Sequence, residues 1–203
     1  MNATSLTISE YSAETSGPTP EQIANATLYL VKSRDSLVAS LIGLSISQLE
    51  FKSAPDRWSI TEIVEHLAII EGAIHKILAQ MPQAPPCPPG WSEAEVDAAV
   101  LRDVPQRSAS VIAPPHICPT GRQTAAEAVV EFLDRRDRPL QLLSSPCLRG
   151  RMMPHPTLGF WDGYQWLLAT ACHALRHLEQ IREVKADPGF PSALASDPAS
   201  SVN

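Results

Sequence analysis

Apolar residues recur at helical spacing along four long stretches of the chain. The first stretch runs from about Thr19 to Gly43. Thr19 followed by Pro20 is typical of a helix start, because proline is favoured at the first helical position. The apolar positions lie roughly on one side of the predicted helix: Ile23, Leu30, Leu37, Leu41 and Leu44.

The second stretch is the clearest amphipathic helix in the chain. It opens at Ser59, where the sequence Ser59-Ile60-Thr61-Glu62 predicts a capping box, and it ends at Pro82. Its apolar stripe contains Ile63, Leu67, Ile70, Ile74 and Leu78.

The third and fourth helices are predicted in the second half of the chain. The third begins near Thr124, where Thr124-Ala125-Ala126-Glu127 again indicates a capping box, and runs to about Leu143 with a bend or interruption near Pro139. The fourth begins around Gly159 to Trp161 and runs to about Lys185. No alternating run indicates a sheet.

Proline is frequent between Pro82 and Pro119, which predicts a long crossover with one short helix starting at Ser92. The fold class is therefore all-α: a four-helix bundle with a long Pro-rich crossover between helices two and three. Residues 1–17 and 187–203 are expected to be a disordered lead and tail, because their small polar residues cannot bury enough apolar surface. One domain, 18–186, remains between them.

Composition and charge narrow the function classes. The 203 residues are 44% hydrophobic, carry a formal net charge of -6 and contain no Lys/Arg cluster. Nucleic acid and membrane are therefore not expected as partners. The N-terminus has no signal-peptide pattern, and the four cysteines follow no C-x-x-C spacing, so we expect reduced thiols and a cytoplasmic protein.

Three histidines are the candidate metal ligands. His173 and His177 are four residues apart in the fourth helix, so they project from adjacent turns of one face. His66 lies at the edge of the apolar stripe of the second helix. Taken separately, each histidine is more often a structural hydrogen-bonder; together they predict a site with open coordination positions. Imidazole suits zinc, nickel, iron or copper.

The remaining histidines and one buried acid are assigned other roles. His75 is expected at the surface or rim, and His116 and His155 in loops, where solvent exposure is favoured over lining a pocket. Glu71 projects into the apolar stripe and needs a partner. It either pairs with an arginine such as Arg34 or orients a ligating imidazole. No motif for a serine hydrolase, phosphate loop or dinucleotide fold is present, and no catalytic residue is predicted.

Two segments resemble the DinB-like or YfiT-like superfamily of metalloenzymes. One is Arg57-Trp58-Ser59 through His66-Leu67; the other runs from His155-Pro156 and Gly159 through Trp166-Leu167 to His173-Ala174-Leu175-Arg176-His177 and Ile181. With the first and third helices, the resemblance covers roughly residues 18–186.

The resemblance implies an up-up-down-down four-helix bundle, often dimeric, in which His66, His173 and His177 bind nickel or zinc. Relatives include transferases and isomerases that use low-molecular-weight thiols such as bacillithiol, mycothiol or glutathione. A thiol-dependent S-transferase acting on a small electrophile is therefore the first expectation. The alternatives are a metal-dependent hydrolase, a non-catalytic metal-binding stress protein and a helical interaction module whose histidines bind no metal.

Overall fold

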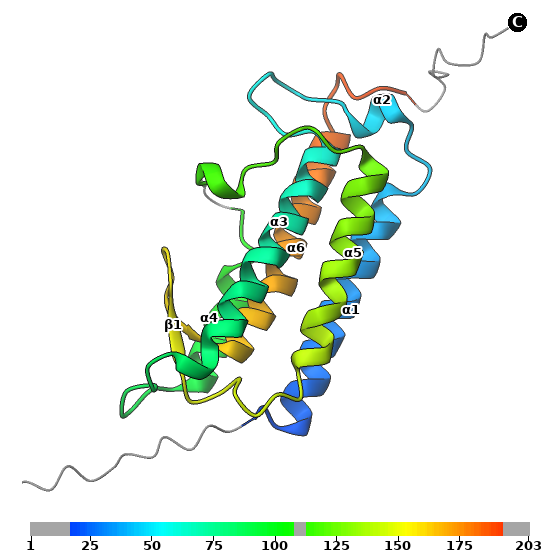
Figure 1. Cartoon of the computed structure of the whole chain (residues 1–203). Coiled ribbons are helices and arrows are strands. Elements are labelled where there is room, and N and C mark those ends of the chain that lie inside the picture. Colours follow the sequence, from blue (N-terminus) through cyan, green and yellow to red (C-terminus); the bar gives the residue numbers. More distant parts are fainter. Residues whose placement is uncertain (1–16, 108–112, 193–203) are drawn as a thin grey trace, which may run out of the picture.

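The structure is a computed structural model that describes residues 17–107 and 113–192. These residues are mostly helical, with one small sheet, which confirms the helical fold class in outline (Figure 1). The elements are α1 (Pro20–Leu41), α2 (Ile46–Leu49), α3 (Ile60–Gln80), η1 (Met81–Gln83), α4 (Glu93–Asp103), η2 (Pro115–Ile117), α5 (Ala125–Leu142), β1 (Met152–His155), β2 (Gly159–Asp162) and α6 (Gly163–Lys185).

Three of the four predicted long helices begin where their capping residues indicated. The side chains of Thr19, Ser59 and Thr124 each accept a hydrogen bond from the backbone N–H three residues later, and a capping box is complete at each. Each box satisfies backbone donors that the first helical turn leaves without a partner. Helix α5 also continues through Pro139, so the predicted interruption there does not divide it.

The fourth long helix begins later than predicted, because residues 159–162 form a strand instead. Its N-cap is Asp162, whose side chain accepts a hydrogen bond from the backbone N–H of Gln165. Strand β2 pairs antiparallel with β1, from Met152 opposite Asp162 to His155 opposite Gly159. The expectation that the chain has no sheet was therefore wrong. Each strand has only four residues, which is too short for a clear alternating pattern.

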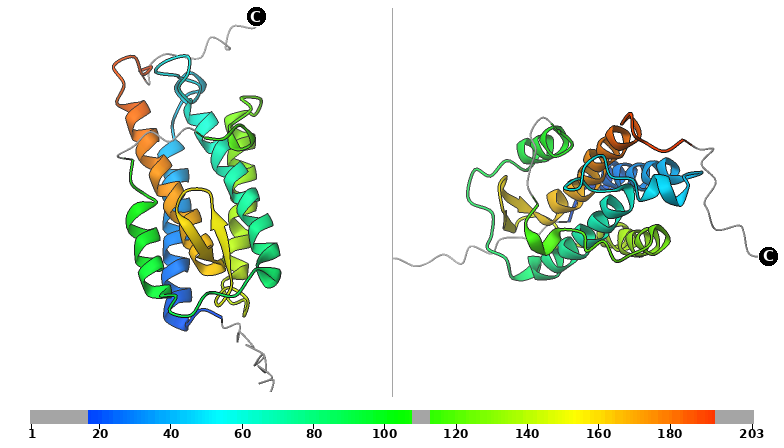
Figure 2. Two further views of the ribbon diagram at one scale, coloured as in Figure 1. Left: turned by 90° about the vertical axis from the view of Figure 1, so that its left-hand side faces the viewer. Right: turned by 90° about the horizontal axis from the view of Figure 1, so that it is seen from above.

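The four long helices α1, α3, α5 and α6 lie side by side (Figures 1 and 2). Helix α3 packs against α5 and α6, and α1 packs against α6 and α5. The short helix α4 and the β1–β2 hairpin both pack on α6, on one side of the long helices (Figure 2). Two groups of buried apolar side chains fill the interior. One includes Leu30, Trp161 and Leu167; the other includes Ile63, Phe132 and Ile181.

The directions of the long helices differ from the up-up-down-down order. Helices α1 and α6 are parallel. Two hydrogen bonds show this: the Tyr164 hydroxyl donates to the Gln22 carbonyl near the starts of both helices, and the Lys185 ammonium donates to the Ser40 carbonyl near their ends. Helices α3 and α5 run the other way (Figure 1). The order is up-down-down-up, because the Pro-rich connection returns the chain along the length of α3 and the other two links turn at the ends of the molecule.

One buried arginine ties the four long helices together. Arg136 on α5 donates to the Glu71 carboxylate on α3, to the Leu30 carbonyl and Ser33 hydroxyl on α1, and to the Thr170 carbonyl on α6. Arg136 and Glu71 are 0% and 1% exposed. The partner of Glu71 is therefore Arg136. Of the two alternatives from the sequence, pairing with an arginine is confirmed, although the arginine is Arg136 and not Arg34.

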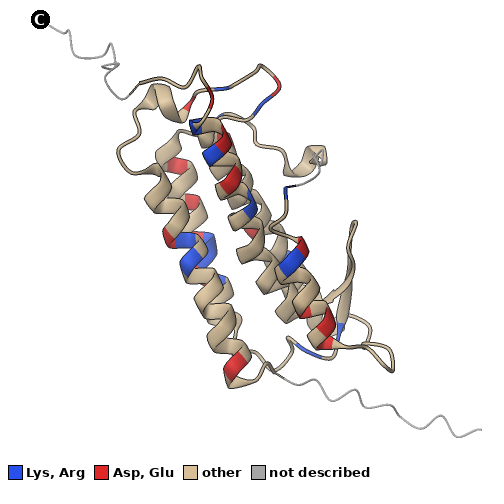
Figure 3. Ribbon diagram, turned by 180° about the vertical axis from the view of Figure 1, so that it is seen from behind, with Lys and Arg blue, Asp and Glu red and all other residues tan. Residues whose placement is uncertain are grey.

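Residues after α6 pack on the region around α2. Phe190 packs edge-on against Phe51, and the Gln48 amide donates to the Pro191 carbonyl, so residues 187–192 contact the α2 region. Residues 1–16 of the predicted lead and 193–203 of the predicted tail lie outside the described residues. Basic and acidic positions are interspersed along the ribbon (Figure 3). Among the described residues, no helix is both long and apolar enough to cross a membrane.

Candidate metal centre

His66 of α3 meets His173 and His177 of α6 between two antiparallel helices. The Nε2 atom of His173 lies 3.1 Å from Nε2 of His66 and 3.1 Å from Nε2 of His177. The candidate ligand atoms of the three side chains all lie within 4.8 Å of one another. The structure thus brings together the three histidines that the sequence singled out.

Hydrogen bonds at the far side of two rings determine which nitrogen faces the cluster. Nδ1 of His66 lies 2.7 Å from the carbonyl oxygen of Ile117, and Nδ1 of His177 lies 2.8 Å from Oε1 of Gln180. Both partners are acceptors, so each Nδ1 carries the proton and each Nε2 presents a lone pair. This pattern of an outer acceptor behind an imidazole is usual for metal-ligating histidines.

Burial keeps the three rings neutral. Desolvation lowers the pKa of His66, against the opposing effect of the Ile117 carbonyl. Desolvation, with a smaller repulsion from neighbouring cationic groups, lowers the pKa of His173 to about 3 and that of His177 well below its usual value. Neutral imidazoles are the form that binds metal. Three neutral imidazoles whose ring nitrogens converge are a donor set that fits a divalent ion.

An aromatic side chain closes one side of the cluster. The Trp58 ring lies 4.7 Å from the His66 ring and stacks on the His177 ring at 6.3 Å, measured between centroids. Trp58 directly precedes Ser59, the N-cap of α3, so the start of the helix fixes its place beside His66. The indole therefore excludes water from this side of the three histidines.

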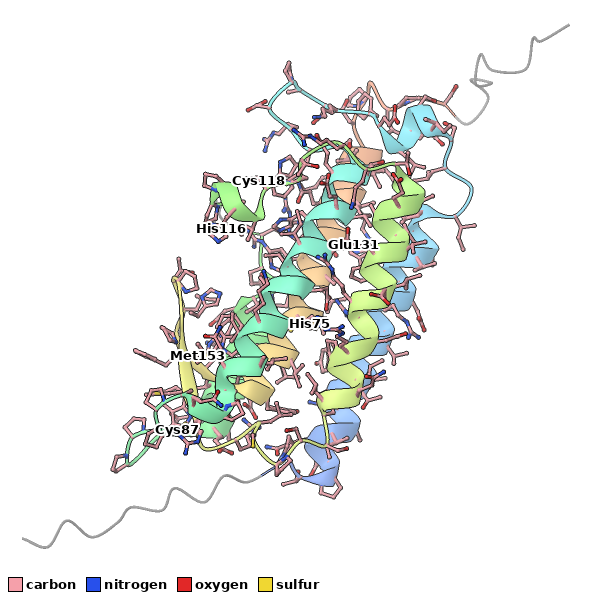
Figure 4. All side chains as sticks on the ribbon, in the orientation of Figure 1. His75, Cys87, His116, Cys118, Glu131 and Met153 are labelled. Carbon is pink, nitrogen blue, oxygen red and sulfur yellow. The ribbon has the colours of Figure 1, made fainter. Side chains whose placement is uncertain are left out.

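Residues 117–121, at the end of the connection between α4 and α5, are hydrogen-bonded to α3 beside the cluster. Both oxygens of the buried Glu65 carboxylate accept hydrogen bonds, from the Thr120 N–H and hydroxyl and from the Gly121 N–H. Glu65 precedes His66, which donates to Ile117 in the same segment. Figure 4 shows His116 and Cys118, the neighbours of Ile117, on this segment at one side of α3. This part of the connection therefore borders the site.

The other three histidines lie outside the cluster. His116 is exposed on η2, as expected. His75 is half-buried on α3, and its Nε2 atom has no hydrogen-bond partner in the part of the chain that the structure describes. His155 differs from the expected solvated loop residue. It ends β1, packs on Trp161 and Trp166 with centroids 4.1 and 5.4 Å away, and its pKa is lowered to about 4 by burial.

Several residues that shape the site gave little signal in the sequence. Glu65 is a polar helix residue whose partners come from a distant segment, and the contribution of Ile117 is a backbone atom. Only Gln180 had a sequence clue, since it lies three residues after His177 and so on the same side of the helix.

Comparisons with known proteins identify the family of the chain. The family model of the DinB superfamily matches residues 29–181. The chain is 28% identical over 145 residues to the uncharacterized protein YuaE of Bacillus subtilis (strain 168), which covers 71% of this chain and 88% of that protein. No solved structure matches. The match over most of the chain, including all three histidines, shows that the protein belongs to the DinB superfamily.

Proposed function

We propose that the protein is a divalent-metal-dependent enzyme of the DinB type, in which His66, His173 and His177 hold nickel or zinc inside a four-helix bundle. The supporting observation is the convergence of three Nε2 atoms, two of them fixed by acceptors behind the ring. Three protein ligands leave a coordination position open, as catalytic sites require.

The reaction that we propose is the transfer of a low-molecular-weight thiol to a small electrophile. An ion on these histidines would lower the pKa of a bound thiol and so supply a nucleophile at neutral pH. The chain's own residues prepare this chemistry. Ile117 and Gln180 hold two imidazoles in the ligating tautomer, and Trp58 excludes water from one side.

A metal-dependent hydrolase is the second candidate. All three ligands are neutral imidazoles, a donor set that zinc enzymes also use to activate water. We further propose a homodimer in the cytoplasm that acts on small molecules; light scattering after size-exclusion chromatography tests the dimer.

Elemental mass spectrometry of protein purified without chelator tests the metal centre. We expect about one nickel or zinc ion per chain, and its loss in each of His66→Ala, His173→Ala and His177→Ala. His75→Ala is the matched control, because this histidine lies on α3 outside the cluster and its variant should keep the ion. A wild-type protein that takes up neither metal would refute the proposal.

A paired assay separates the two reactions. The metal-loaded protein is incubated with a chromogenic alkyl or aryl halide and bacillithiol, mycothiol or glutathione, and separately with a chromogenic ester without thiol. Turnover that requires a thiol and disappears in His177→Ala supports the transferase; ester cleavage alone supports the hydrolase. A bound ion with neither activity would indicate the non-catalytic metal-binding protein.

A further inference from the structure

Arg107, in the connection that follows α4, reaches across to α6. Its Nε and Nη2 atoms donate to the two carboxylate oxygens of Glu183 at 2.9 and 2.7 Å, and its Nη1 donates to Oε1 of Gln180 at 3.3 Å. The Arg107 side chain is 24% exposed. One guanidinium therefore holds two side chains that lie one turn apart on α6.

Gln180 has a second contact, and that contact reaches the candidate metal centre. Its Oε1 atom also accepts the hydrogen bond from Nδ1 of His177 at 2.8 Å. A guanidinium has five N–H donors and no acceptor, so the Gln180 atom that faces Arg107 has to be the amide oxygen. Arg107 thereby fixes which end of the Gln180 amide faces His177.

The orientation of this amide decides the tautomer of His177. With the oxygen facing the ring, Nδ1 carries the proton and Nε2 presents its lone pair toward His66 and His173. Without Arg107, the amide is free to turn its NH₂ group toward the ring. Nδ1 would then accept, the ring proton would move to Nε2, and Nε2 could no longer bind a metal.

We propose that Arg107 is a positioning residue that acts through Gln180 to hold His177 in its metal-binding tautomer. The role of the tautomer rests on the proposed metal-dependent function; the hydrogen-bond chain itself does not.

The same connection serves a second histidine. Ile117, on the other side of residues 108–112, supplies the carbonyl that accepts from Nδ1 of His66. The segment between α4 and α5 thus supports His66 directly and His177 through Gln180. Arg107 and Ile117 therefore set the orientation of two candidate ligands.

Zinc affinity of the full-length protein tests the proposal. We expect Arg107→Ala to weaken zinc binding about tenfold, the lower end of the effect of removing an outer partner of a metal ligand. Competition with a chromophoric chelator measures it. Arg182→Ala is the matched control, because this exposed arginine pairs with Glu179 one turn from the same region and should leave the affinity unchanged.

Histidine-ring ¹⁵N spectra of the metal-free protein separate positioning from a general loss of structure. The wild type should show His177 protonated at Nδ1, and Arg107→Ala should show a mixture of tautomers with an unchanged melting temperature. Gln180→Glu in the Arg107→Ala background should restore both the tautomer and the affinity, because a carboxylate offers only acceptors.

The outcomes are distinguishable from those of the proposed function. An Arg107→Ala protein with wild-type zinc affinity and His177 still protonated at Nδ1 would overturn the positioning role. A wild type that binds no zinc would refute the metal-dependent function, and the ring spectra would still decide whether Arg107 sets the tautomer.

Discussion

Arg136 and Glu71 form an ion pair that is buried in the core. Both side chains are removed from water, so each depends on the other. Burial raises the pKa of Glu71, and the Arg136 charge opposes that rise. One Glu71 oxygen, Oε2, has no hydrogen-bond partner among the described residues. The pair therefore carries a large desolvation cost that only an intact partner offsets.

We expect Glu71→Gln or Arg136→Ala to lower the free energy of unfolding by about 3 to 5 kcal/mol, because either change leaves a buried polar group unpaired. Urea denaturation followed by circular dichroism measures it. Arg102→Ala, which breaks the exposed pair with Asp103, is the control and should have no measurable effect. Equal effects of buried and exposed substitutions would contradict the assigned role of Arg136.

His155 predicts a pH dependence of stability. Its folded pKa of about 4 lies below the ordinary value of 6.5, so the folded state binds fewer protons than the unfolded state. The stabilising contribution is fully present above pH 6.5 and is lost as the pH falls from 6.5 toward 4. Protonation would also remove the acceptor for the Thr157 and Leu158 N–H groups.

His155→Asn tests this dependence, because the asparagine oxygen can accept from the same two N–H groups without titrating. Melting temperatures between pH 7.5 and 4.5 should fall less steeply in the variant than in the wild type. Carboxylates that titrate in this range are common to both proteins. Identical slopes would show that His155 is not a source of the acid sensitivity.

At the scale of the structural elements, the position of the segment 113–121 depends on hydrogen bonds to the Glu65 carboxylate of α3. Glu65→Gln replaces one acceptor oxygen with an NH₂ group that faces N–H or hydroxyl donors, so we expect the segment to loosen. Hydrogen exchange at the Thr120 and Gly121 amides should accelerate at least tenfold, corresponding to a loss of about 1.4 kcal/mol. Glu50→Gln, an exposed substitution in the loop before α3, is the control. Unchanged exchange would contradict the anchoring role.

The elements also show what local sequence can determine. The starts of α1, α3 and α5 were predictable because a capping box is a contact within four residues. The start of α6 has the same signal in Asp162 and Gln165, yet the prediction began the helix about three residues early. The hairpin escaped prediction because two prolines and four-residue strands obscure any alternation.

In the candidate site, too, local sequence indicated some residues and contacts between distant segments determined others. The three histidines were recognisable from helical spacing and from the resemblance, since both helices were correctly placed. Two of their supporting groups were not, because Ile117 acts through a backbone atom and Arg107 reaches α6 from a segment that is distant in sequence. The partner of Glu71 was missed for the same reason: several arginines were available, and only packing selects Arg136.

At the scale of the whole molecule, the directions of the helices determine which residues meet at the candidate metal centre. Because α3 and α6 are antiparallel, residues 66, 173 and 177 meet, whereas a different order of directions would separate them. The link between α3 and α5 returns along the molecule and brings Arg107 and Ile117 to the histidines on the way. The site is thus built from three separate stretches of chain: α3, the link between α3 and α5, and α6.

A metal ion bound by both α3 and α6 should stabilise the entire fold, because the unfolded chain cannot present the three histidines together. With free zinc at a hundred times its dissociation constant, mass action contributes about 2.7 kcal/mol, and we expect the melting temperature to rise by about 5 to 10 °C. Differential scanning calorimetry with and without zinc, followed by chelation to reverse the shift, measures it. His66→Ala should abolish the shift and His75→Ala should retain it. A shift that survives in His66→Ala would contradict an ion shared by α3 and α6, since α3 would then contribute no ligand to the ion.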